Sequence, residues 1–309
     1  MLRLVAICCA CLSAIACETE KLTLNEPAGS SGSMPSMVDG RLVFGTEEAL
    51  GTFLDEHIRE EAQPIEAFLP RDFQSYRTAV RRAFDNLEVA VDQEELTETQ
   101  LGAAIDTKFL HIDRNTNEVR PNVPDGPFSA VLNESGEIQV GDNVHRYTRE
   151  LAQTLTRATD GTLTLLSEHP SSFVVLSSTE ADDEELGSRA KSCTVQMNGS
   201  SRRRMKGEFQ KNNFGVWGEF RFLTKRQKKR VGIWSRRSAD YLQVNGQPLG
   251  FRCITQRWEN RGAVGNNCRG CSITDAASGH LGDVYCGDDG DGQHRAIKGD
   301  SDVRCNTSR

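Results

Sequence analysis

The sequence predicts an α+β fold, with a mixed helical and β N-terminal domain followed by a β-rich, disulfide-stapled C-terminal domain. Three observations lead to this prediction: helical spacing of apolar residues in the first half, period-two alternation in the second, and cysteines concentrated near the end. The chain has 309 residues, a length typical of about two domains. Its composition excludes a collagen, a coiled-coil rod and a wholly disordered chain.

The first 17 residues predict an export signal. Arg3 precedes an apolar run over residues 4–16, which at ~13 residues is too short to span a bilayer and fits a signal peptide. The end of the run allows two alternatives. Signal peptidase would cleave after Ala16, whereas a lipobox would make Cys17 the lipidated first residue, carrying palmitate or a similar acyl chain. Lipidation leaves an even number of cysteines downstream, which favours a membrane-anchored lipoprotein.

Residues 18–39 are polar and rich in Gly and Ser, which predicts a flexible tether. Residues 40–178 are expected to form the α+β domain. Thr46 and Asp72 are each expected to begin a helix, and a third helix is expected over residues 95–109. Two β-prone runs over residues 136–147 flank Gly141 and Asp142, which predicts a hairpin.

An acidic stretch over residues 179–192 is expected to link this domain to a basic, cysteine-containing domain over residues 193–309. In that second part, alternating residues 216–222 and the run 231–234 predict two strands. The intervening residues 225–230 would then form a hairpin turn with a cationic tip.

Several segments resemble uncharacterised lipoproteins of the Bacteroidota. They are the signal ending in Cys17, Gly-Arg-Leu-Val-Phe at residues 40–44, Gly-Glu-Ile-Gln-Val-Gly-Asp at residues 136–142, and the Arg/Lys-rich strands near the end. The resemblance implies a membrane-anchored envelope protein of unknown role, and it supplies no site residues.

Six cysteines follow Cys17, and in an exported protein they predict disulfides. Fifteen pairings are possible for Cys193, Cys253, Cys268, Cys271, Cys286 and Cys305. The C-x-x-C at residues 268–271 leaves open a redox site, or a zinc site completed by His280, Cys286 or His294.

Two further ligand sites are expected from residue patterns. Asp289, Asp291 and Asp300 have the spacing of a Ca²⁺ loop, although His294 stands where an EF-hand has glycine. The other is an anion-binding surface, with solvated strand edges as the alternative explanation. Its candidate residues are Arg202, Arg203, Arg204, Lys225, Arg226, Lys228, Lys229 and Arg230.

No G-x-S-x-G, H-E-x-x-H or P-loop motif is present, so no catalytic residue is assigned. The sequence is therefore interpreted as an exported, outer-membrane-anchored lipoprotein with a non-enzymatic binding or structural role and no cofactor other than Ca²⁺. Its expected partner is an anionic surface glycan or lipopolysaccharide, and no nucleic acid is expected. The alternatives are a secreted hydrolase with a site assembled from scattered residues, and a calcium-dependent carbohydrate-binding module at the C-terminus.

Overall fold

The computed structural model describes residues 34–58, 65–92, 97–158, 162–170, 172–176, 192–252, 261–268, 270–278 and 285–307. Side chains are described in these ranges except at residues 172–176, 220, 247–252, 261–268, 271–278 and 285–291. The described part is mixed and mostly β, with three sheets and the helices α1, α2 and α3, which confirms the predicted class at that level. None of the described helices is both long and apolar enough to cross a membrane.

The first sheet has six strands and contains the predicted hairpin. In spatial order they are β1 (Ser36–Val38), β2 (Arg41–Phe44), β5 (Glu137–Val140), β6 (Asn143–Tyr147), β7 (Leu151–Arg157) and β8 (Leu163–Pro170). β5 and β6 pair across Gly141 and Asp142, as predicted. Gly141 has φ 59° and is the first turn residue, where a type II′ hairpin needs glycine. Because β1 pairs with β2, residues 36–38 belong to a sheet and not to the tether predicted over residues 18–39.

The second sheet has eight strands drawn from both halves of the chain. Its main path is β10 (Ser192–Met197), β11 (Ser200–Asn213), β12 (Trp217–Arg230), β13 (Ile233–Arg237), β4 (Glu118–Pro121) and β3 (Leu110–Asp113). In addition, β9 (Ser172–Leu176) pairs with β11, and β16 (Gly270–Ser278) pairs with β12. The predicted segments 40–178 and 193–309 therefore share one sheet, within a compact unit that runs from Met34 to Arg309. The predicted linker lies outside the described residues apart from Ser192, which begins β10.

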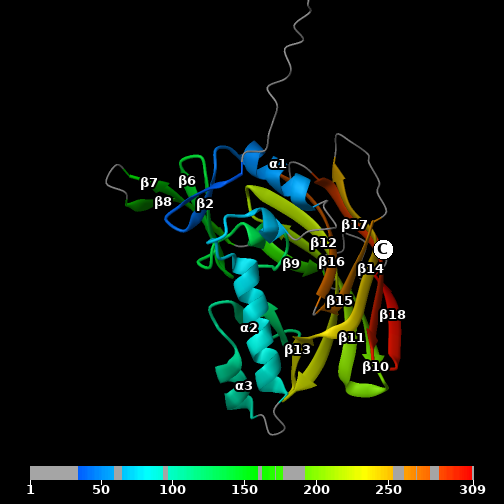
Figure 1. Cartoon of the computed structure of the whole chain (residues 1–309). Helices are drawn as coiled ribbons and strands as arrows, with labels where there is room; N and C mark the ends of the chain where they lie inside the picture. The colour runs from blue at the N-terminus through cyan, green and yellow to red at the C-terminus, as the bar shows by residue number, and fades with distance from the viewer. Residues whose placement is uncertain are drawn as a thin grey trace, which may run out of the picture. The chain divides into compact units, whose positions relative to one another are not determined.

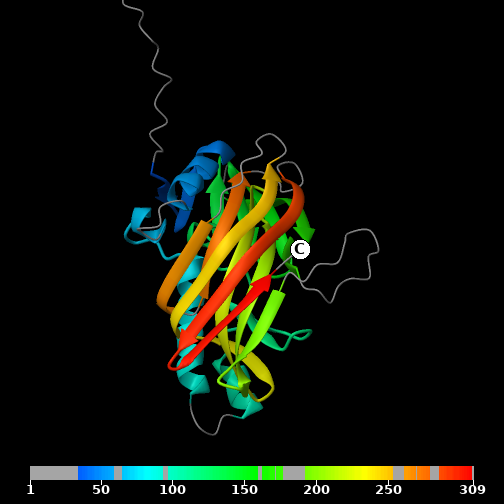
Figure 2. The ribbon, with the colours of Figure 1, turned by 90° about the vertical axis from the view of Figure 1, so that its right-hand side faces the viewer.

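The third sheet packs against the second. Its order is β15 (Arg261–Cys268), β14 (Ala239–Arg252), β17 (Tyr285–Lys298) and β18 (Ser301–Thr307). In Figure 2 its yellow-to-red strands lie in front of green strands of the second sheet. A hydrophobic cluster joins Phe209 and Phe222 of the second sheet to Leu242 and Val244 of the third. β14 runs without a break through Asn245 and Gly246.

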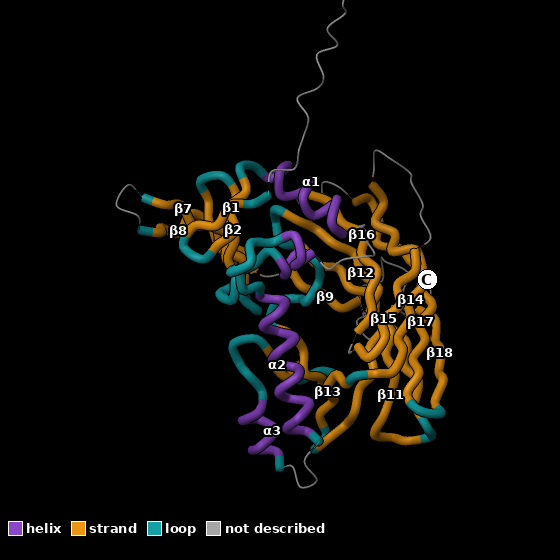
Figure 3. Tube along the Cα trace, viewed as in Figure 1, coloured by secondary structure: helices purple, strands orange, loops and turns teal. Residues whose placement is uncertain are grey.

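Capping residues determine where the helices begin. Thr46 accepts a hydrogen bond from the Ala49 N–H, and α1 (Glu47–Ile58) follows, as predicted. α2 (Tyr76–Val91) begins after the cap Ser75, which corrects the start predicted at Asp72. α3 (Glu98–Ala104) begins with a capping box and is shorter than the predicted 95–109. Figures 1 and 3 show α2 and α3 next to each other, with α2 alongside β13.

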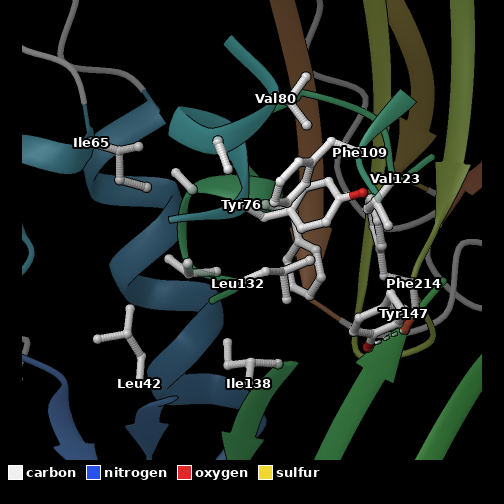
Figure 4. Packing of buried hydrophobic residues seen from close by; sticks show 14 of the residues in the cluster. Leu42, Ile65, Tyr76, Val80, Phe109, Val123, Leu132, Ile138, Tyr147 and Phe214 are labelled. Carbon is white, nitrogen blue, oxygen red and sulfur yellow. Dashed lines mark hydrogen bonds between the residues drawn. The ribbon is translucent and has the colours of Figure 1, made fainter. Parts of the chain in front are cut away.

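The larger hydrophobic core joins the helices to the first two sheets. Figure 4 shows Tyr76, Phe109, Tyr147 and Phe214 packed among aliphatic side chains. The Tyr147 hydroxyl donates a hydrogen bond to the Phe214 carbonyl oxygen at 2.7 Å. Phe214 lies in the connection from β11 to β12, so this core too combines both halves of the sequence.

Candidate functional site

The predicted cationic turn over residues 225–230 is wrong. These residues are the last six of β12, and the turn is formed by Val231 and Gly232, which have φ 46° and 83°. The strand continues because its alternate side chains find partners on both faces of the sheet. On one face, Arg226 donates to the Ser238 carbonyl oxygen at 2.5 Å, and Lys228 pairs with Asp92 at 3.0 Å. On the other face, Lys225 pairs with Glu118 and Glu208.

The other predicted anion-binding residues do not form one exposed patch either. Arg202 and Arg203 are exposed, but Arg204 pairs with Glu118 and lies 3.9 Å from the centre of the Trp234 ring. Lys229 lies over the same ring at 5.6 Å, and Arg230 is half-buried. A single basic surface made of all eight residues is therefore excluded.

Lys225 is instead at the centre of a buried group of charges, which we call the ion cluster. Its members are Glu118, Arg120, Arg204, Lys206, Glu208 and Lys225. The Lys225 Nζ lies 3.1 Å from a Glu118 carboxylate oxygen and 2.8 Å from one of Glu208. Both carboxylates are fully buried, and the Lys225 side chain is 1% exposed. The cluster thus keeps its charges away from solvent and leaves no group free for a ligand.

The surroundings of Glu118 and Glu208 in the ion cluster favour the ionised form of both carboxyl groups. Burial by itself would raise the pKa of Glu118, but Lys225, Lys206 and Arg120 outweigh burial and lower it to about 2. The pKa of Glu208 is likewise lowered by Lys225 and Lys206 against the effect of burial. Because each carboxylate touches more than one cation, the arrangement stabilises the ionised form.

Among the described residues, the structure contains one of the disulfides predicted for the six cysteines that follow Cys17. Cys193 of β10 and Cys305 of β18 form a disulfide that links the second and third sheets. Cys253 lies outside the described residues, as do the side chains of Cys268, Cys271 and Cys286, so their pairing stays a prediction.

His294 does not fit the zinc alternative. Its Nδ1 lies 2.7 Å from the Thr224 hydroxyl and its Nε2 lies 3.1 Å from the Thr307 hydroxyl, so both ring nitrogens are already engaged. Burial lowers the pKa of His294 to about 4, which keeps the ring neutral. Among the described side chains, no group of three or more His, Cys, Asp or Glu is placed to hold a metal ion.

The predicted Ca²⁺ loop is not formed either. Asp289 and Asp291 lie within β17, opposite Leu249 and Gln247 of β14, and Asp300 lies in the turn after β17. An extended strand rises ~3.3 Å per residue, so Asp289 and Asp300 are separated by roughly 30 Å. Ligands of one ion must lie within a few ångströms of it, so these carboxylates cannot share a single Ca²⁺.

A different feature has the form of a binding site. A cavity of about 680 Å³ lies beside α3, β3 and the segment after β6. We call it the His111 cavity. Tyr76, Ile105 and Leu110 are buried and supply apolar lining. Its volume is within the range of small-molecule sites, and its lining combines apolar side chains with polar and charged ones.

His111 is oriented in this cavity by Asn122, and both residues line it. The His111 Nδ1 lies 3.0 Å from the Asn122 Oδ1. The Asn122 Nδ2 donates to the carbonyl oxygens of Thr107 and Lys108 at 2.9 and 3.0 Å. Burial, and next the positive charge of Arg149, lower the pKa of His111, so the neutral imidazole is favoured.

The charges that line the His111 cavity are three cations and two carboxylates, namely Lys108, Arg114, Arg149, Glu134 and Glu150. Their ion pairs are long, because Lys108 lies 4.0 Å from Glu134 and Arg149 lies 3.8 Å from Glu150. Exposed pairs at such distances hold their partners weakly. The cations therefore remain able to bind an anionic group on a ligand.

Sequence reasoning missed this site. None of the motifs in the sequence includes His111, Asn122, Arg114 or Arg149. His111 and Asn122 are brought together because β3 and β4 form a hairpin that pairs His111 with Arg120. If the hairpin of β3 and β4 had been predicted, the proximity of His111 and Asn122 would have followed, because residues that face each other across a hairpin are separated by few positions in the chain.

Comparison with known proteins adds little to this geometry. No family model and no curated protein sequence matches the chain. A crystal structure of a DUF4848 family protein from Bacteroides thetaiotaomicron is similar to it at 14% sequence identity and a TM-score of 0.30. The match covers 88% of this chain and 98% of that one. A similarity of this size carries no argument about fold or function.

Proposed function

We propose that this protein is an exported, lipid-anchored protein of the cell envelope that binds a small anionic ligand in the His111 cavity. The observation that carries the binding role is the combination of apolar lining with cations whose ion pairs are long. Apolar surface provides affinity through burial, and a few polar groups orient the ligand.

The envelope location is supported by the signal-like residues 1–17 and by the disulfide between Cys193 and Cys305. Disulfides persist in oxidising compartments outside the cytosol. Cys17→Ser is expected to abolish acyl labelling and to release the protein from the membrane fraction. If the variant stays on the membrane and the wild type carries no acyl chain, the lipid anchor is refuted.

The binding role is tested with an anionic apolar dye, 8-anilinonaphthalene-1-sulfonate, on the folded protein. Gly102 lines the cavity, and a Cβ added there meets no atom within 4 Å, so Gly102→Phe is expected to fill the cavity without disturbing the backbone. Gly45→Phe is the matched control, because Gly45 is equally unobstructed and lies outside the cavity. Saturable dye binding should be lost in the first variant and kept in the second. Equal binding by both variants would refute the proposal.

The orientation of His111 supports a second candidate, a hydrolase in which this residue is a general base. A neutral histidine held by an amide oxygen is a common arrangement for activating a nucleophile. However, among the described residues no Ser, Thr or Cys is hydrogen-bonded to His111 Nε2, so the binding role is better supported. Turnover of p-nitrophenyl acetate that is lost in His111→Gln would favour the enzyme instead.

A further inference from the structure

The hydrogen bonds of Asn122 determine which nitrogen of His111 is available to a ligand. Its amide nitrogen is used by two carbonyl oxygens, at 2.9 Å to Thr107 and 3.0 Å to Lys108. Its Oδ1 is therefore the atom that faces His111, and an oxygen can only accept a hydrogen bond. The proton of the neutral ring must then be on Nδ1, and Nε2 carries the lone pair. Nε2 has no hydrogen-bond partner among the described residues, so it needs a donor from the ligand.

The donor is better supplied by a hydroxyl than by an ammonium group. Arg149 is close enough to lower the pKa of His111, so a ligand cation at Nε2 would be repelled by this arginine. A neutral hydroxyl can donate to Nε2 without this repulsion.

The anionic part of the ligand would meet arginine. Arg149 and Arg114 both line the cavity and are exposed, and the ion pair of Arg149 is the long one to Glu150. Guanidinium groups match the planar geometry of a carboxylate and can bind both of its oxygens. Ile105 and Leu110, which are buried, offer an apolar surface for the body of the ligand.

We propose that the His111 cavity binds an acidic sugar, a uronic acid unit of an anionic glycan. Its carboxylate would bind Arg149 and Arg114, a ring hydroxyl would donate to His111 Nε2, and the C–H face of the ring would rest on Ile105 and Leu110. This inference rests on the proposed function, because it names the ligand of the same cavity.

The test is displacement of the bound dye by D-glucuronate, with D-glucose and acetate as controls. Glucuronate is expected to displace the dye at millimolar concentration and far better than either control. Arg149→Gln should weaken glucuronate by about tenfold, which is the loss of one charge-assisted hydrogen bond, and should leave glucose unchanged. His111→Phe should weaken glucuronate similarly and leave acetate unchanged.

Each other result overturns a stated part of the proposals. If acetate equals glucuronate, the cavity is a simple anion site and the sugar assignment is refuted. If glucose equals glucuronate, the role of the arginines is refuted. If the dye binds in the cavity and glucuronate does not displace it, the inference fails and the proposed function stands. If filling the cavity with Gly102→Phe does not affect the dye, the proposed function itself fails.

Discussion

The ion cluster and the His111 cavity both bring charged side chains together beside the hairpin of β3 and β4, yet they differ in what surrounds the charges. In the ion cluster the Lys225 Nζ contacts two carboxylates, at 3.1 and 2.8 Å, and is excluded from solvent. In the cavity the Arg149 side chain is 48% exposed and lies 3.8 Å from its partner. Charge alone therefore does not identify a binding surface. What identifies one is a cation whose counter-ion is distant.

The comparison also separates two roles for β3 and β4. Glu118 and Arg120 of β4 belong to the ion cluster, whereas Leu110, His111 and Ile112 of β3 line the cavity. One strand of the hairpin thus contributes to the buried charges and the other contributes to the site. The ion cluster fixes the position of β4 against β11 and β12, and β4 in turn positions β3 through their backbone hydrogen bonds. Damage to the cluster should reduce stability, and damage to the cavity should reduce binding.

The largest expected effect is that of Lys225→Met. It removes a buried ammonium that lies between two buried carboxylates, and breaking such a group typically costs ~3–5 kcal/mol. The measurement is the free energy of unfolding by urea denaturation. Lys229→Met is the matched control, four residues along the same strand and on the same face, where the lysine is half-buried over Trp234. Its cost should stay below about 1 kcal/mol. Equal losses in the two variants would contradict the ion cluster.

Acid should destabilise the protein by protonating His294, whose two ring nitrogens are both hydrogen-bonded. The pKa of His294 is lowered from 6.5 to about 4, so the unfolded chain binds a proton first as the pH falls. The contribution of neutral His294 is fully present above pH 6.5 and is lost as the pH falls through about 4. The loss is at most about 3 kcal/mol.

Urea denaturation at several pH values checks this prediction. His294→Gln should reduce the pH dependence between 6.5 and 4, and the part that remains belongs to the other histidines with a lowered pKa, His111 and His145. Glu118 adds a separate loss at lower pH, since its pKa of about 2 is below the ordinary 4.5. A pH dependence that is unchanged in His294→Gln would argue against the neutral, doubly bonded ring.

Local sequence signals predicted much of the fold. The cap at Thr46 and the hairpin at Gly141 were predicted, because each depends on neighbours a few residues away. The turn at residues 225–230 was predicted wrongly because the carboxylates that accept Lys225 are 107 and 17 positions away in the chain. Runs of charge look like solvated turns when their partners are unknown.

The candidate site was beyond sequence reasoning for a related reason. His111 and Asn122 belong to no sequence motif, and the arginines of the cavity, Arg114 and Arg149, come from two separate segments of the chain. The link between Cys193 and Cys305 has a sequence separation of 112, and only the pairing of β10 and β18 with their sheets brings these residues together. The sequence indicated a disulfide and could not select this pair.

Two glycines allow a smaller test of how tightly each region is packed. A Cβ at Gly126 would lie 2.2 Å from the carboxylate of buried Glu219, whereas a Cβ at Gly102 in the cavity wall meets nothing within 4 Å. Gly126→Ala is therefore expected to lower the free energy of unfolding by ~1–3 kcal/mol. Gly102→Ala is expected to raise it by ~0.5–1 kcal/mol, since alanine favours the helix. Thermal denaturation of both variants measures the difference. A loss in Gly102→Ala would indicate that the cavity is not open.

The smallest expected effect on stability, and the most direct test of the cavity's electrostatics, is that of Arg149→Gln. Arg149 is exposed and its ion pair is long, so the free energy of unfolding should change by less than about 0.5 kcal/mol. The pKa of His111 should nevertheless rise toward its ordinary value, because the positive charge that helps burial to lower it has been removed. A titration of the imidazole C–H signals by NMR measures this shift, and His294 in the same spectrum is the internal control because its pKa should not move. If the pKa of His111 is unchanged, Arg149 does not act on the imidazole, and the cavity lacks the pairing of neutral histidine with arginine on which ligand recognition would depend.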